Sequence, residues 1–195
     1  MKKISSWIVV LGVLAIVALW AVNVYNGLVQ QEEQVETDWA QVENQYQRRI
    51  DLIPNLVATV KGYASHEQET LEGVINARAK ATQVTIDPSN ATPEQLAAYQ
   101  SAQGELSQAL GRLLAVAESY PDLKANENFR DLQAQLESTE NRITIARQTF
   151  NDSARKFNTE IRRFPKNIVA MIFGFERKPY FEAEEGANKA PKVEF

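Results

Sequence analysis

The feature that most constrains this chain is an uncharged stretch of 21 residues near its start, from Ile4 to Val24. A helix of about 20 apolar residues is long enough to cross the hydrocarbon of a bilayer. Trp7 and Tyr25 lie 18 residues apart, about 27 Å at roughly 1.5 Å per residue, which suits two interfacial aromatic belts. We therefore predict a membrane anchor over residues 1–25, marked by Ile4, Trp7, Trp20, Val24 and Tyr25.

A cleaved signal peptide is the alternative interpretation of this stretch. However, the apolar run exceeds the roughly 7–15 residues of a signal peptide, and no small-x-small cleavage pair ends it. Lys2 and Lys3 precede the run, acidic residues follow it, and the next basic residue is Arg48. The positive-inside rule then predicts a single-pass protein with a cytoplasmic N-terminus and its body outside the cytoplasm.

Beyond the anchor, the apolar residues recur every three or four positions, as they do along one face of a helix. Three such stripes follow one another, at residues 35–60, 96–117 and 129–161. The second begins after Thr92-Pro93-Glu94-Gln95, which has the form of a capping box with proline at the first helical position. The third is predicted to begin near Asn126 and to end at Phe164-Pro165.

These helices are too long for a globule. A helix from Asn126 to Arg163 would measure nearly 60 Å at about 1.5 Å per residue. We therefore predict an all-α protein, in which a single N-terminal transmembrane helix precedes an elongated antiparallel bundle of three to four long helices. The bundle would cover residues 26–181, and the acidic residues 182–195 would form a disordered tail. The helix count depends on whether the first segment is one kinked helix or divides near Ser65-His66-Glu67-Gln68.

The composition excludes several kinds of catalytic and metal-binding site. The chain has no cysteine and one histidine, so a thiolate nucleophile, a Cys-based metal site and a multi-His zinc site are excluded. His66-Glu67 is the first half of a zinc-protease motif, but Thr70 stands where the second histidine would be. A net charge of −4 gives no general attraction for nucleic acid. We predict no catalytic residue, no cofactor, no metal and no nucleic-acid partner.

Pro54 lies inside the first stripe and removes one backbone hydrogen bond to the carbonyl of Ile50. A cluster of polar residues surrounds this break, namely Arg48, Arg49, Asp51 and Asn55. One interpretation is a set of interhelical ion pairs that fix the helix register, with Asn55 or Arg49 bonding the freed carbonyl. The other interpretations are a recognition site for a partner and a small-ligand pocket. Polar residues that recur on the third helix are the predicted contacts: Asn141, Arg142, Arg147 and Asn151.

Several linked motifs resemble those of the LemA family. They are residues 46–57 around Pro54, residues 120–129, residues 140–151, and Phe164-Pro165 followed by Gly174-Phe175 and Tyr180-Phe181-Glu182. The likeness extends from the anchor to Glu182. It implies an N-terminal membrane helix, an all-helical bundle and no established enzymatic activity. It also implies a bacterial cell membrane, since members are membrane-tethered bacterial proteins, some of them linked with envelope proteases.

Residues 168–175 form an uncharged apolar segment in basic surroundings, with a local charge balance of +5 over residues 155–178. Eight residues cannot span a bilayer. We predict a non-helical segment that packs on the end of the bundle, or rests in a membrane interface or on a partner. Its candidate docking residues are Ile168, Met171, Phe173, Phe175, Lys166, Arg177 and Lys178.

Two functions are consistent with the sequence. The first is a non-enzymatic adaptor, anchored in the envelope, whose partners are the lipid bilayer and another envelope or membrane protein, with a membrane protease among the candidates. The second is a self-associating structural protein that scaffolds or shapes the membrane. A continuous uncovered apolar stripe would favour self-association, whereas a discrete exposed patch would favour a different partner.

Overall fold

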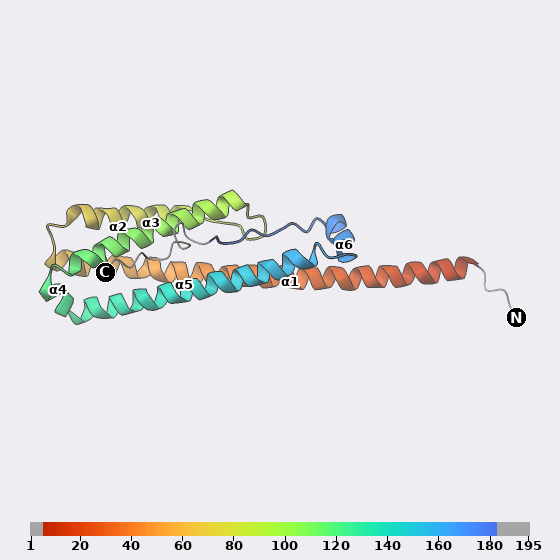
Figure 1. The fold of residues 1–195 in the computed structure, drawn as a ribbon, viewed down its shortest axis with the longest axis horizontal. Coiled ribbons are helices and arrows are strands. Elements are labelled where there is room, and N and C mark those ends of the chain that lie inside the picture. Colours follow the sequence, from red (N-terminus) through yellow and green to blue (C-terminus); the bar gives the residue numbers. More distant parts are fainter. Residues whose placement is uncertain (1–5, 183–195) are drawn as a thin grey trace, which may run out of the picture.

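The computed structural model describes residues 6–182, and within that range every element of regular structure is an α-helix, as predicted. The helices in chain order are α1 (Ser6–Tyr63), α2 (Gln68–Gln83), α3 (Pro93–Ala117), α4 (Pro121–Ala125), α5 (Glu127–Glu160) and α6 (Lys166–Phe173). The described part of the chain forms one elongated body with a single projecting helix (Figure 1). The predicted disordered tail lies almost wholly outside the described residues.

The helix α1 joins the anchor and the body. It contains 58 residues, about 87 Å at roughly 1.5 Å per residue. Its first part is apolar enough to cross a membrane and almost none of it is buried, whereas regular burial begins around Val24 and Leu28. Figure 1 shows this part projecting alone from one end of the bundle, here called the anchor end. The anchor and the body are therefore one continuous helix.

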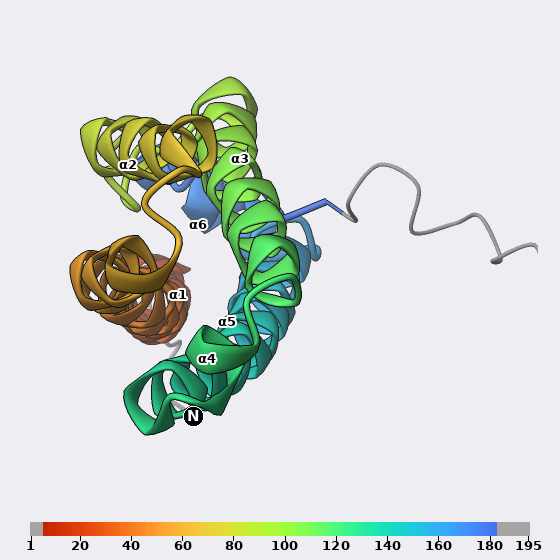
Figure 2. The same ribbon diagram turned by 90° about the vertical axis from the view of Figure 1, so that its left-hand side faces the viewer.

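Four long helices form the body. α1 runs antiparallel to α5, and α2 runs antiparallel to α3 (Figure 1). Seen along the long axis, the α2–α3 pair lies to one side of the α1–α5 pair, with the short α4 at the end opposite the anchor (Figure 2). This end is the far end of the bundle. The predicted elongated antiparallel bundle is thus present, with four long helices.

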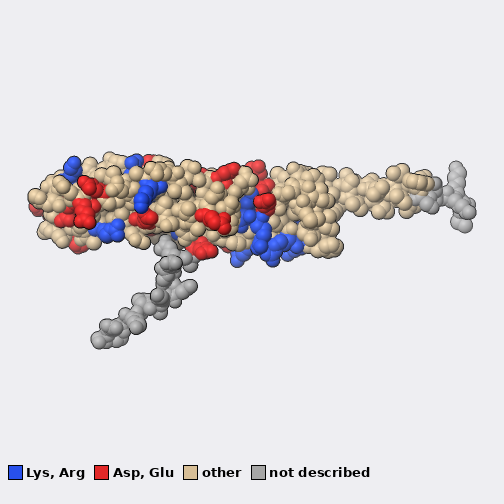
Figure 3. All heavy atoms as spheres, turned by 90° about the horizontal axis from the view of Figure 1, so that it is seen from above, with Lys and Arg blue, Asp and Glu red and all other residues tan. Residues whose placement is uncertain are grey.

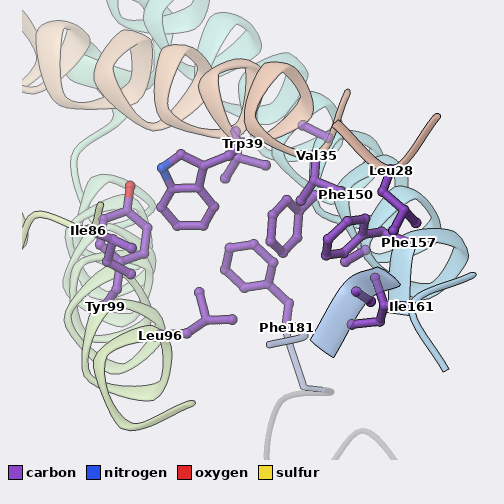
Figure 4. Close-up of a cluster of buried hydrophobic side chains, with 14 of the residues drawn as sticks. Leu28, Val35, Trp39, Ile86, Leu96, Tyr99, Phe150, Phe157, Ile161 and Phe181 are labelled. Atoms are coloured by element: carbon purple, nitrogen blue, oxygen red, sulfur yellow. The ribbon is translucent and has the colours of Figure 1, made fainter. Parts of the chain in front are cut away.

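Two apolar clusters fill the core. The first lies toward the anchor end and includes α1 residues from Val24 to Tyr46. The second lies toward the far end and includes α1 residues from Ile50 to Ala64. In the first cluster, Trp39 packs against Phe150 and Phe181, with ring centroids 5.4 and 5.8 Å apart (Figure 4). The apolar stripe of α1 is therefore covered within a single chain.

The predicted capping signals are confirmed. Gln95 N donates to Thr92 Oγ1, and Thr92 N donates to Gln95 Oε1, which completes the capping box of α3. Asn126 caps α5 by accepting a hydrogen bond from the backbone N–H of Phe129. These side chains satisfy backbone groups that have no partner within the first turn of a helix.

The structure decides between the two alternatives for the first predicted segment. α1 continues through Pro54 to Tyr63 and α2 begins at Gln68, so the segment divides near Ser65-His66-Glu67-Gln68, as the second alternative predicted. The carbonyl of Ile50 accepts a hydrogen bond from Arg78 Nε at 3.3 Å. The prediction that Asn55 or Arg49 would bond this carbonyl was wrong, because the nearest suitable donor comes from the neighbouring helix α2.

The prediction of a non-helical segment at residues 168–175 was also wrong. Residues 166–173 form α6, which ends where Gly174 adopts φ +74°. Glycine favours this left-handed conformation because it has no Cβ. The backbone N–H of Phe175 donates to the carbonyl of Ala170 and closes the helix end. A continuous run of apolar residues shows no helical period, so length and composition alone misled the prediction.

The burial of Trp39 predicts a large effect of its removal. Trp39→Ala should lower the free energy of unfolding by about 3–5 kcal/mol, since it leaves a cavity beside three aromatic rings. Urea denaturation of the detergent-solubilised chain, followed by circular dichroism, measures this. Ile145→Ala is the control, because Ile145 is 63% exposed. Equal effects of the two substitutions would contradict the description of this core.

Candidate functional site

Arg49 is the one predicted site residue near Pro54 that points into the bundle. Its side chain is 2% exposed and forms an ion pair with Glu140 on α5 at 2.9 Å. It also donates to Ser107 Oγ at 2.7 Å and to Gln103 Oε1 at 2.7 Å, both on α3. The guanidinium lies 5.1 Å from the ring centroid of Tyr46. One cation therefore connects three of the four long helices.

This group of residues forms a polar layer, defined here as Arg49, Gln103, Ser107, Glu140 and the buried Thr139. The layer separates the two apolar clusters, since on each helix the residues on either side belong to different clusters. A buried cation without its partners is costly, so sliding one helix by a turn would be unfavourable. The contacts of the polar layer therefore fit the register in which α1, α3 and α5 pack.

The other members of the predicted cluster lie on the outside of α1. Arg48, Asp51, Pro54 and Asn55 are all exposed. Asp51 accepts a hydrogen bond from Gln47 of the same helix at 2.7 Å, and the Asn55 carbonyl accepts one from Thr59. The structure therefore does not bring these four side chains together with Arg49 as one site.

A matched pair of substitutions tests the polar layer. Arg49→Ala should lower the free energy of unfolding by about 3 kcal/mol, because it leaves the buried Oε1 acceptor of Gln103 without its donor and breaks the ion pair with Glu140. Arg48→Ala, one residue earlier and exposed, should change it by no more than about 0.5 kcal/mol. Urea denaturation of both variants measures the difference. A near-neutral Arg49→Ala would show that the layer does not contribute to stability.

After α6 the chain turns back along the bundle as an extended segment, residues 174–182, here called the strap. Three amide side chains bond it in the same manner, each accepting from a backbone N–H and donating to the carbonyl of the same residue. Asn158 bonds Lys178 in this way at 2.9 and 2.8 Å. Asn151 bonds Phe181 at 2.9 and 3.0 Å, and Gln100 bonds Glu182 at 3.3 and 2.8 Å. The second half of the strap, from Lys178 to Glu182, is thereby held to α3 and α5 by side-chain amides.

The sequence analysis did not identify Asn158 or Gln100 as structural residues. The sequence did contain a signal for one of them. Asn158 is an amide that directly follows Phe157, a member of the apolar stripe at residues 129–161. A buried amide requires hydrogen-bond partners, and its neighbours in the same helix do not supply them. Such a residue predicts a non-helical segment packed beside the helix.

Lys178 was predicted to belong to a basic rim, but the structure buries it. Its Nζ forms an ion pair with Glu32 at 2.7 Å, donates to the Ser89 carbonyl at 2.8 Å, and lies 5.8 Å from the ring of Phe157. These contacts join the strap to α1 and to the loop before α3. Arg177, the preceding residue, is exposed.

The amide contacts of the strap can be tested by exchange. Asn158→Ala should lower the free energy of unfolding by about 1–3 kcal/mol and speed hydrogen exchange of the Lys178 amide, which loses its acceptor. Hydrogen–deuterium exchange with mass spectrometry measures the change over residues 176–182. Asn167→Ala is the control, because Asn167 is an exposed amide of α6. Unchanged exchange in the Asn158 variant would refute this role.

The predicted docking segment lies at the anchor end. Ile168, Met171 and Phe173 are exposed, whereas Val169 and Ala170 of the same helix are buried. The ring of Phe173 lies 4.7 Å from that of Tyr25, at the end of the predicted anchor, and the half-buried Phe175 lies 5.7 Å from it. α6 is therefore held beside α1 where the anchor meets the body.

The remaining predicted anchor residues differ in their exposure. Trp7 and Trp20 are exposed, and Val24 is buried against the body. Ile4 lies outside the described residues.

Two of the grooves on the surface of the body are lined by residues of the strap or of the α1–α5 pair. One, of about 530 Å³, lies beside the strap and is lined by Ala97, Asn158, Arg177 and Tyr180. The other, of about 690 Å³, lies between α1 and α5 and is lined by Gln41, Gln45, Asn141, Arg142 and Ile145. Among residues 6–182, no three His, Asp or Glu side chains lie close enough to hold a metal ion.

Together these observations define a class of protein, a bundle of four long helices continuous with a single apolar N-terminal helix. The comparisons with known proteins agree, since the sequence profile of the LemA family matches residues 38–195. The chain belongs to the LemA family, as its motifs predicted.

Three relatives illustrate this relationship. Magnetosome protein MamQ 2 of Paramagnetospirillum magneticum is 30% identical, with 95% of this chain and 75% of the relative aligned. Magnetosome protein MamQ of Magnetospirillum gryphiswaldense is 29% identical, over 87% of this chain and 68% of the relative. Protein LemA of Metamycoplasma hominis is 24% identical, over 82% and 69% respectively. These proteins place the chain in a bacterial, membrane-associated family.

Proposed function

We propose that this protein is a non-enzymatic adaptor of the bacterial envelope, anchored in the membrane, which presents its helical body to another envelope protein. The observation that carries this proposal is that the apolar stripes are covered within one chain. Away from the anchor and the neighbourhood of α6, the large apolar side chains left exposed in the described body are Tyr63, Ile75, Ile145 and Tyr180. They do not form a continuous stripe, which a rod that self-associates along its length would require.

The groove between α1 and α5 is the candidate face for a protein partner. It combines polar side chains, Gln41, Asn141 and Arg142, with the exposed Ile145. Gln45 also lines it, and its Oε1 atom is buried without a hydrogen-bond partner. A buried acceptor without a partner is uncommon, so Gln45 marks an unusual position in this groove. A membrane protease of the envelope is one partner of this kind.

Self-association is the second candidate function. Two of the relatives are named as magnetosome proteins. This relationship to membrane-associated proteins supports a protein that scaffolds or shapes a membrane. The two functions differ in the identity of the molecule that contacts the body, so cross-linking distinguishes them.

Photo-crosslinking in native membranes tests the proposal. A photoreactive residue at Ile145 should yield an adduct with a different envelope protein, whereas the same residue at Ile75, exposed on α2, serves as the matched control. Mass spectrometry identifies the adduct. Adducts that contain only second copies of the chain would favour the scaffold and contradict the adaptor.

The proposed topology makes a separate prediction. We expect the body to lie outside the cytoplasm, because Lys2 and Lys3 precede the anchor and acidic residues follow it. A protease added to intact spheroplasts should therefore digest the chain from about Gln30 onward. Digestion that occurs only after lysis would reverse the orientation.

A further inference from the structure

α6 presents an apolar face that the rest of the chain does not cover. Ile168, Met171 and Ile172 share one side of the helix by their spacing of three and four residues, and Met171 and Ile172 are 78% and 69% exposed. Phe164, just before the helix, is also exposed. Val169 and Ala170 on the other side are buried. α6 is therefore apolar on both sides, with one apolar face packed on the bundle and the other exposed.

The position of this face is fixed by the anchor. Tyr25 contacts both Phe173 and Phe175, so α6 lies at the level of Tyr25 along α1. Trp7 and Tyr25 are 18 residues apart, about 27 Å along a helix, which is close to the roughly 30 Å thickness of the hydrocarbon. When α1 crosses the bilayer, Tyr25 and α6 therefore lie at the membrane surface. Any other occupant of this face would have to displace lipid.

Basic residues lie on the body side of this apolar surface. Figure 3 shows a cluster of Lys and Arg at the end of the body, followed by an uncharged surface that continues into the anchor. The cations of this region are Arg155, Lys156, Arg162, Arg163, Lys166 and Arg177. This order, charge and then apolar surface, matches the order of headgroups and acyl chains in a leaflet.

Some of these cations form ion pairs with carboxylates of the protein, and others do not. Arg155 pairs with Asp152, while Arg163 and Lys166 both pair with Glu160. The hydrogen bond from Lys166 lowers the pKa of Glu160, so this carboxyl stays ionised. No ion pair within residues 6–182 is formed by three exposed cations of the region, Lys156, Arg162 and Arg177.

We propose that α6 is a second membrane contact, in which Met171, Ile172 and Phe164 enter the leaflet that faces the body while Lys156, Arg162 and Arg177 bind anionic lipid headgroups. The contact would hold the rod in a defined orientation on the membrane, because two points of attachment restrict tilt more than a single helix does. The inference rests on the membrane anchoring of the proposed function and is independent of the protein partner.

Single labels test the apolar half of the contact, since the chain has no cysteine of its own. Ile172→Cys and the control Ile75→Cys carry an environment-sensitive fluorophore in the full chain, reconstituted in liposomes of phosphatidylcholine with phosphatidylglycerol. Lipids with a nitroxide near the headgroup should quench the Ile172 label and leave the Ile75 label unchanged. A label at Ile172 that is as accessible to aqueous iodide as the control would overturn the proposal. A label at Ile172 that neither quencher reaches would also overturn the proposal, because it would show that protein rather than lipid covers α6.

Charge variants test the anionic lipid. Replacing Lys156, Arg162 and Arg177 together by Gln should abolish the stronger quenching at Ile172 in phosphatidylglycerol relative to pure phosphatidylcholine. The matched control replaces three exposed cations of the far end by Gln, namely Lys61, Arg112 and Arg130, and should retain this difference. Equal loss in both variants, or no lipid preference in the parent chain, would overturn the headgroup contact.

Flotation with the liposomes reports the anchor separately. Failure of every variant to float would overturn the anchoring itself. Flotation with an unquenched Ile172 label would overturn only the role of α6.

Discussion

The packing of α1 along α5 is the interaction on which the rest of the structure depends. α1 contacts α2, α4, α5 and α6, and its polar layer also reaches α3, so each helix of the body is positioned against it. Because the same helix continues into the apolar segment proposed as the anchor, an α-helical backbone connects that segment directly to the body. Within residues 6–182, no linker separates the two.

The polar layer and the apolar clusters have different roles in this arrangement. Burial of residues such as Trp39 and Phe157 supplies most of the stabilisation, since apolar burial is the dominant favourable term in folding. Such burial is non-directional, and similar stripes on four helices would also pack in neighbouring registers. The contacts of Arg49 with Glu140 and Gln103 are directional, so they favour one register over the others.

Much of the fold could be predicted from local patterns. The capping box at Thr92, the cap at Asn126 and the apolar periods are set by residues near one another in the sequence, and they marked α3 and α5 well. Two of the errors concern contacts between distant residues: Arg78 bonds the Ile50 carbonyl, and Glu32 with Ser89 buries Lys178. No local pattern marks such partners. The error at α6 was local, because an uninterrupted apolar run carries no helical period.

The two ends of the bundle are built differently, because only the anchor end contains α6 and the start of the strap. The far end is closed by the short α4, whereas at the anchor end the chain passes from α5 through α6 and returns along the body as the strap. Asn158 bonds the strap close to Lys178, and Lys178 in turn pairs with Glu32, seven residues beyond Tyr25 on α1. A displacement of α6 relative to the anchor would therefore strain an ion pair in the body. This coupling gives the proposed position of α6 at the membrane surface a direct physical connection to the α1–α5 packing.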